Sequence, residues 1–217
     1  APQPLVGTVV RHQLFSALSE DRAWGESALL DPTDGVVYAY SCDEDPPLPG
    51  STLPPERTGS CGLASVPLAD VTDRSAWRYW SGSAGWVDDA AAATALDLPP
   101  GLDGVEIPRA SFTVSFDPVH HVYVMAYTPW PGIVGRLQVR VATLPSGPWT
   151  APVDVQLPGC SDQVAGVSFY CYAGTAQPAF SGDGLLGLGY YDQLLSLSGA
   201  GGGYIVVEVP FTVLVTI

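Results

Sequence analysis

Short runs in which polar and apolar residues alternate recur along the 217-residue chain and predict β-strands. The clearest is at residues 109–127, where hydroxyl side chains alternate with Phe and Val. Asp117-Pro118 follows, and then a second run rich in Val and Tyr. Alternation interrupted by Asp-Pro is typical of a β-hairpin. The same order of strand, Asp/Gly-rich turn and strand ending in Tyr occurs at residues 26–40 and 177–191.

Each predicted hairpin is followed by one or two further short apolar runs. Four antiparallel strands repeated in this way are typical of a propeller blade. We therefore expect an all-β fold, a β-propeller, with blades at about residues 24–81, 109–157 and 175–209. An ordinary β-sandwich with similar hairpins is the alternative.

Three blades raise a problem of closure, because a propeller needs at least about four. The strand-like ends Leu5–Arg11 and Phe211–Ile217 could form a closing blade, or the propeller assignment could be wrong. We favour a third option, in which a second polypeptide or an upstream segment supplies the missing blades. Residues 1–217 would then be one propeller domain or part of one.

One stretch has a helical composition. Residues 88–98 (DDAAAATALDL) are rich in Ala and Leu, which are strong helix formers. We expect a short surface helix there, between two blades.

The charge balance excludes some classes of partner. The chain has 22 acidic residues against 8 basic ones, all of them Arg, and a net charge of −14. Nucleic acids and anionic membranes attract clustered positive charge, so neither is an expected partner. No run of 18 apolar residues predicts a membrane span.

The four cysteines fall into two local pairs, Cys42 with Cys61 and Cys160 with Cys171, each bracketing a turn-rich loop. An even number of loop cysteines favours two disulfides and an oxidising compartment. Buried free thiols are the alternative, and the spacing does not fit zinc. Because the chain also begins at Ala1 without a Met, we expect a secreted, extracellular or periplasmic protein.

Three segments resemble a known family. Residues 24–41 (WGESALLDPTDGVVYAYS) resemble the blade signature of secreted five-bladed β-propeller glycoside hydrolases of the arabinanase and β-xylosidase type. Residues 110–118 and 146–153 are similar to short sequence segments of related bacterial secreted propellers. The resemblance implies a polysaccharide or glycan as partner, no cofactor, and a pair of carboxylates that flank the glycosidic bond.

Glu26 matches the position of the family's general acid, so it is the candidate catalytic acid. The alternative is a strand-end carboxylate that forms a salt bridge with Arg22 or Arg109. The second carboxylate has no clear counterpart, and Glu106 and Asp192 are weaker candidates. Asp31 and Asp117 lie in predicted hairpin turns, which explain them fully.

Substrate contacts are expected from Trp130, Arg109 and Gln177. Trp130 lies in a T-P-W-P-G loop that would expose its ring for stacking, whereas Trp77 and Trp149 are expected in the core. No metal site is predicted, although residues 43–45 could contact Ca²⁺ through oxygen ligands. Two functions stay open, namely a carbohydrate-active propeller and a non-catalytic binding or structural propeller in an extracellular assembly.

Overall fold

The computed structural model describes residues 24–42, 60–100, 107–130, 136–157, 163–164, 167–168, 171–182, 184–192 and 203–212. For residues 107–111, 130, 163–164 and 167–168 it describes the backbone alone. In this part of the chain no helix is long and apolar enough to cross a membrane.

The first sheet has five antiparallel strands in sequence order. They are β1 (Ser27–Leu30), β2 (Val36–Cys42), β3 (Cys61–Pro67), β4 (Arg78–Trp80) and β5 (Trp86–Val87). The β1–β2 turn forms because Asp31 Oδ1 accepts a hydrogen bond from the Thr33 amide at 2.8 Å. Gly35 follows with φ of 71°, a conformation that favours glycine.

The second sheet has four antiparallel strands, again in sequence order. They are β6 (Ile107–Asp117), β7 (Val122–Trp130), β8 (Arg136–Ala142) and β9 (Val153–Gln156). The β6–β7 turn repeats the chemistry of the first, because Asp117 Oδ1 accepts from the Val119 amide at 2.8 Å.

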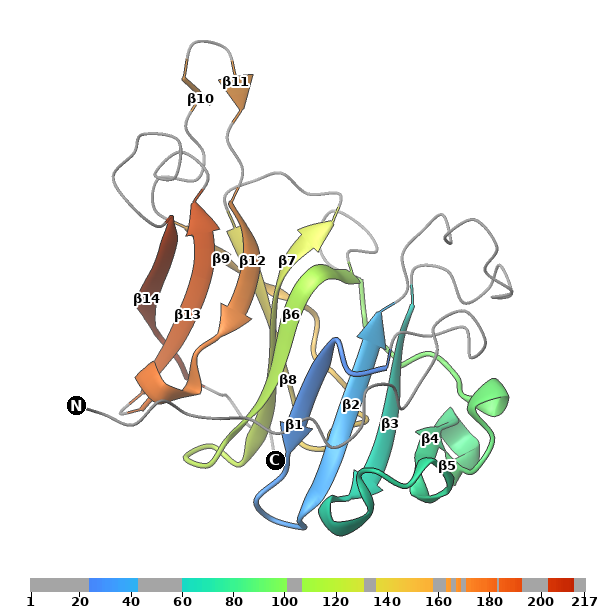
Figure 1. The fold of residues 1–217 in the computed structure, drawn as a ribbon. Coiled ribbons are helices and arrows are strands. Elements are labelled where there is room, and N and C mark those ends of the chain that lie inside the picture. Colours follow the sequence, from blue (N-terminus) through green and yellow to red (C-terminus); the bar gives the residue numbers. More distant parts are fainter. Residues whose placement is uncertain are drawn as a thin grey trace, which may run out of the picture.

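The third sheet has three described strands, β12 (Cys171–Ala176), β13 (Leu185–Asp192) and β14 (Tyr204–Pro210). The short 3-10 turn η6 (Pro178–Phe180) lies between β12 and β13. Two further short strands, β10 (Gln163–Val164) and β11 (Val167–Ser168), pair with each other and project beyond the sheets (Figure 1).

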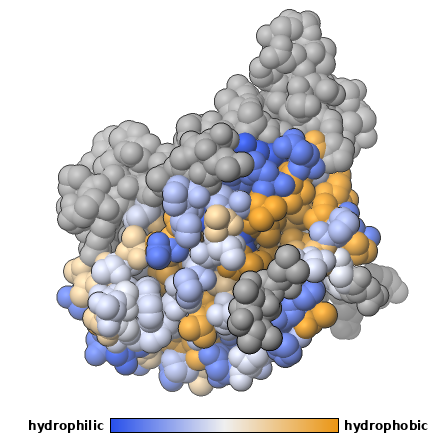
Figure 2. Space-filling view, turned by 180° about the vertical axis from the view of Figure 1, so that it is seen from behind, coloured by the Kyte–Doolittle hydropathy of each residue, from blue (hydrophilic) through white to orange (hydrophobic). Residues whose placement is uncertain are grey.

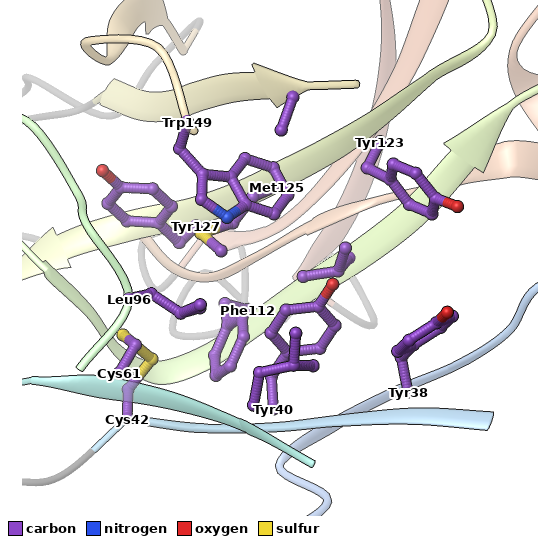
Figure 3. Packing of buried hydrophobic residues seen from close by; sticks show 13 residues of the cluster. Tyr38, Tyr40, Cys42, Cys61, Leu96, Phe112, Tyr123, Met125, Tyr127 and Trp149 are labelled. Carbon is purple, nitrogen blue, oxygen red and sulfur yellow. A yellow bond between two sulfur atoms is a disulfide. The ribbon is translucent and has the colours of Figure 1, made fainter. Parts of the chain in front are cut away.

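The three sheets lie side by side like successive blades (Figure 1). Their first strands adjoin, because β1 contacts β6 and β6 contacts β12. One core, with Tyr40, Met125 and Trp149, fills the space between the first and second sheets (Figure 3). A second core, with Val124, Leu137, Leu188 and Tyr190, fills the space between the second and third.

Side-chain hydroxyls join the first strands of neighbouring sheets. Ser27 Oγ of β1 accepts from the Val114 amide of β6 at 2.9 Å. Thr113 Oγ1 of β6 accepts from the Ala176 amide of β12 at 2.6 Å. The all-β, propeller-type fold that the repeats predict is thus confirmed.

The helix predicted at residues 88–98 is wrong. The structure has a single 3-10 turn there, η5 (Ala90–Ala92), and then extended chain. The amides of Thr94 and Leu96 donate to the carbonyls of Trp80 at 3.0 Å and Cys61 at 2.8 Å. These contacts with strands of the first sheet, and the burial of Leu96, outweigh the helical propensity of the Ala run.

The predicted blade limits differ in detail from the sheets. The first sheet extends past residue 81 to β5, and the third begins at Cys171, four residues before the expected start. Residues 5–11 and 213–217 lie outside the described residues, whereas Phe211 and Thr212 are described but belong to no strand.

The disulfide between Cys42 and Cys61 is confirmed, with the two Cα atoms 4.0 Å apart. It joins residues that face each other at the ends of β2 and β3. Cys171 is also disulfide-bonded. Its expected partner, Cys160, lies outside the described residues, so that pairing stays a prediction.

Candidate functional site

The positions of the candidate residues can be described relative to one end of the sheets. At this end the strands β1, β6 and β12 begin. We call it the entry end; it is at the top of Figure 1. Glu26 precedes β1 at this end, and its side chain is exposed. Its Oε2 accepts a hydrogen bond from the Cys42 amide at 2.6 Å, which holds the carboxylate against the end of β2.

Asp192 ends β13, also at the entry end, and is 5% exposed. Its amide donates to the Gly203 carbonyl at 2.5 Å. Burial and the nearby Asp192 charge raise the pKa of Tyr190. Asp192 belongs to the third sheet and Glu26 to the first, with the second sheet between them.

Three other candidates are placed only in part. Glu106 lies outside the described residues. Arg109 lies in β6 and Trp130 ends β7, but their side chains are not described. Trp130 was expected in a loop, but its backbone belongs to β7 and pairs with Ile107 in the second sheet. Its role stays a prediction.

Gln177 follows the last residue of β12, so it is not at the entry end with Glu26. Its Nε2 donates to Thr175 Oγ1 at 2.9 Å and to the Tyr204 hydroxyl at 2.8 Å. These bonds fix the amide on the third sheet. The structure therefore brings Gln177 together with Tyr204 and not with Glu26.

Asp31 has a larger role than the turn chemistry inferred from sequence. It is fully buried, and Tyr123 of β7 donates a short hydrogen bond to its Oδ2. Burial by itself raises the pKa of Asp31, but hydrogen bonds from Tyr123 and Thr33 outweigh it and lower the pKa below its ordinary value. Burial and the bond to Asp31 raise the pKa of Tyr123 well above its usual range. The group ties the first sheet to the second at the end opposite the entry end.

Asp117 and His120 form the corresponding group of the next turn. His120 Nδ1 and Asp117 Oδ2 are 2.6 Å apart, and the His120 ring contacts Phe211 edge-on with centroids 5.3 Å apart. They line a small pocket of about 120 Å³ together with Ser181. The Ser181 hydroxyl donates to the Gln177 carbonyl and accepts from the Gly187 amide, so it is fixed rather than poised as a nucleophile. Among the described residues, no group of three His, Cys, Asp or Glu could hold a metal ion.

A larger groove of about 310 Å³ runs between the second and third sheets, lined mainly by Val139, Val153, Val155 and Val209. Figure 2 shows apolar side chains gathered on the half of the molecule that carries these sheets. Among the described residues, those that line this groove carry no titratable side chain. The expectation that Trp77 and Trp149 are core residues is confirmed, at 5% and 2% exposed.

Residues 7–189 match the family model described as "Domain of unknown function (DUF4185)". The chain belongs to this family. A DUF4185 chain is thus built, in the described residues, from blade-like sheets with Glu26 at the entry end.

A protein of Mycolicibacterium smegmatis described as an uncharacterized 35.9 kDa protein is 32% identical over 98 residues. The match covers 45% of this DUF4185 chain and 25% of that protein. The matched segment therefore spans about a quarter of the length of this curated relative.

Solved structures with a similar arrangement include a Bacteroides ovatus protein that carries a provisional hydrolase assignment. It has a TM-score of 0.49 and 17% identity, over 78% of this chain and 38% of that one. An exo-β-1,3-galactanase of Phanerochaete chrysosporium has a TM-score of 0.45 and 14% identity, over 77% and 32%. A Bacillus subtilis arabinoxylan arabinofuranohydrolase has a TM-score of 0.40 and 17% identity, over 83% and 32%. Likenesses at this level transfer no substrate.

Proposed function

We propose that this DUF4185 protein is a secreted, carbohydrate-directed propeller of glycoside hydrolase type, with Glu26 as the candidate general acid. The observation that carries the proposal is the place of Glu26. It is an exposed carboxylate directly before the first strand of a blade-like sheet, within the segment that resembles the glycosidase signature. Exposed side chains at such strand ends are the ones that can reach a substrate.

A second carboxylate within about 5 to 9.5 Å would be needed for hydrolysis. Of the two candidates we favour Glu106 over Asp192. Glu106 directly precedes β6, and β6 contacts β1, the strand that follows Glu26. Asp192 is buried in the third sheet, two sheets from Glu26. Arg109 and Trp130, in strands of the second sheet, remain the candidates for sugar contacts, while Gln177 is held on the third sheet.

One contact favours the second candidate function, binding without hydrolysis. The Cys42 amide donates to Glu26 Oε2 at 2.6 Å, and such a donor stabilises the ionised carboxylate. A general acid must instead hold a proton at the start of the reaction. If Glu26 stays ionised, the protein would hold a glycan or an extracellular partner without cleaving it.

The test compares Glu26→Gln and Glu106→Gln with the parent protein on arabinan and xylan. Both hydrolysis and binding to the insoluble polysaccharide are measured, on the protein expressed from its complete coding sequence. Asp70→Asn, at an exposed carboxyl of the 3-10 turn η2 (Leu68–Asp70) that follows β3, is the control. We expect either site variant to lower kcat about 100-fold or more while binding is retained, and the control to be unchanged.

The outcomes separate the two functions. Binding without hydrolysis by the parent protein would establish the non-catalytic role. Hydrolysis that survives Glu26→Gln would refute Glu26 as the acid. Absence of both binding and hydrolysis on these and other plant or microbial polysaccharides would end the carbohydrate proposal.

A further inference from the structure

The third sheet has one face that the described chain does not cover. Along β13, Leu186, Leu188 and Tyr190 are buried toward the second sheet, while the alternate residues point the other way. We call that other side the outward face. It carries Tyr172, Tyr204 and Val206, which are 48%, 47% and 39% exposed.

The tyrosines of the outward face form a continuous row across three strands. Tyr172 of β12 faces Tyr191 of β13, which in turn faces Tyr204 of β14. The rings of Tyr172 and Tyr191 are 4.8 Å apart between centroids. The Tyr204 side chain lies over Gly189, where a Cβ atom would collide with its hydroxyl. The face is therefore aromatic and closely packed within itself.

The other sheets are covered on both faces. The second sheet lies between two cores. The first sheet packs on the second, and its far face is covered by a third core that includes Trp77 and Ala93. Large apolar side chains exposed together on a sheet are unusual in a protein that acts alone and mark an interaction site.

A repeated hydrogen bond indicates what would pack on this face. Each first strand offers a hydroxyl to the amide of the next first strand, Ser27 to Val114 and Thr113 to Ala176. Each amide lies one residue after the next strand's own hydroxyl position. Thr113 precedes Val114, and Thr175 precedes Ala176. Thr175 is thus the third hydroxyl residue of the series, at the position from which its Oγ1 could accept a hydrogen bond from the amide of a following first strand.

We propose that the outward face of the third sheet is the seat of a further antiparallel β-sheet, contributed by polypeptide outside these 217 residues. Its first strand would lie beside β12, with an amide that donates to Thr175 Oγ1. Its apolar side chains would cover Tyr172, Tyr191 and Tyr204. The 98 matched residues are 25% of the Mycolicibacterium smegmatis relative, so that protein is longer than these 217 residues, in line with this arrangement.

A second copy of the chain is the rival occupant. It could not continue the stack head to tail through its first sheet, because the far face of that sheet is already covered, with Trp77 5% and Ala93 2% exposed. A copy packed face to face would place the two Glu208 carboxylates on the same interface, since Glu208 is exposed on the outward face. Like charges facing each other oppose that association.

The first experiment is hydroxyl-radical footprinting read by mass spectrometry. It compares the isolated 217-residue chain with the protein expressed from its complete coding sequence. We expect Tyr172 and Tyr204 to be labelled in the isolated chain and protected in the complete protein. Leu68 and Leu144, which are 49% and 56% exposed in the connections that follow β3 and β8, serve as controls and should be labelled equally in both.

The second experiment tests the hydrogen bond through paired variants. Thr113→Ala removes the acceptor of a used amide, so it should lower the Tm of both forms by about 2–4 °C or more. Thr175→Ala should have a clearly smaller effect in the isolated chain, where Thr175 bonds only side chains of its own sheet among the described residues. In the complete protein its effect should equal that of Thr113→Ala.

Equal labelling of Tyr172 and Tyr204 in both forms would overturn the proposal. So would protection that already appears in the isolated chain and rises with its concentration, because a second copy would then be the occupant. Neither measurement involves a polysaccharide, so the proposal can stand or fall apart from the function proposed above.

Discussion

At the scale of single residues, Asp31 is the side chain whose role depends most on its surroundings. Its two oxygens accept from Thr33 within the turn and from Tyr123 of the next sheet. Tyr38 makes a related contact nearby, since its hydroxyl donates to Asp34 at 2.8 Å. These donors stabilise the ionised form of the buried Asp31 carboxylate. They also make the contact between the first two sheets specific.

Asp31→Asn should destabilise the chain by about 2–4 kcal/mol, because it removes charged acceptors and leaves buried donors poorly matched. Urea unfolding at neutral pH measures the loss. Asp117→Asn is the matched control, because Asp117 occupies the same turn position but is partly exposed and bonds only within its own turn among the described contacts. A loss for Asp31→Asn no larger than that of the control would refute the role of the Tyr123 bond.

The same group predicts a dependence of stability on pH. The folded-state pKa of Asp31 is lowered from its ordinary value of 3.8, so its contribution is complete above about pH 4. It is lost as the pH falls through the lowered folded-state pKa. Asp117, whose pKa burial would raise but the His120 bond and turn amides lower, acts in the same direction. The free energy of unfolding of Asp31→Asn should fall less steeply below pH 4 than that of the parent chain, and parallel curves would contradict this assignment.

At the scale of elements, the ends of β2 and β3 are joined by the Cys42–Cys61 disulfide, which closes a loop with a sequence separation of 19 residues. Glu26 adds a bond to the same end through the Cys42 amide. Leu96 adds another, because its amide donates to the Cys61 carbonyl. The entry end of the first sheet is thus fixed from three parts of the chain.

Replacing both cysteines, Cys42→Ser with Cys61→Ser, should cost about 3 kcal/mol, chiefly because the unfolded loop gains freedom. Thermal unfolding of the variant and of the parent, with and without reductant, measures the loss. Reductant should lower the Tm of the parent by more than that of the variant. If the variant and the parent had the same Tm, the disulfide would contribute nothing to the free energy of unfolding.

At the scale of the whole molecule, the sheets form a stack in which each joint has an apolar core and a hydroxyl-to-amide bond between first strands. Within the described residues, the stack is covered at its first sheet, whereas side chains are exposed on the outward face of its third. Its net charge of −14 opposes the approach of anionic polymers at long range.

Most strands could be predicted from the sequence, because apolar and polar residues alternate at consecutive positions of a half-buried strand. The Asp-Pro turns at Asp31 and Asp117 could also be predicted, since the hydrogen bonds of each aspartate within its turn reach only two or three residues along the chain. The same locality allowed Cys42 and Cys61 to be paired. Glu26 was found through a resemblance, and its catalytic role is a proposal.

The tertiary structure decided what depends on distant residues. Asp31 meets Tyr123, 92 positions away, and no local pattern distinguishes that buried carboxylate from an ordinary turn residue. The Ala-rich run at residues 88–98 forms one 3-10 turn and then extended chain, because the carbonyls of Trp80 and Cys61 accept hydrogen bonds from its amides. Likewise, alternation along β13 shows that one face is apolar, but only the stacking of the sheets decides which face is buried. Sequence thus determined the local elements, and packing between sheets determined the role of the residues within them.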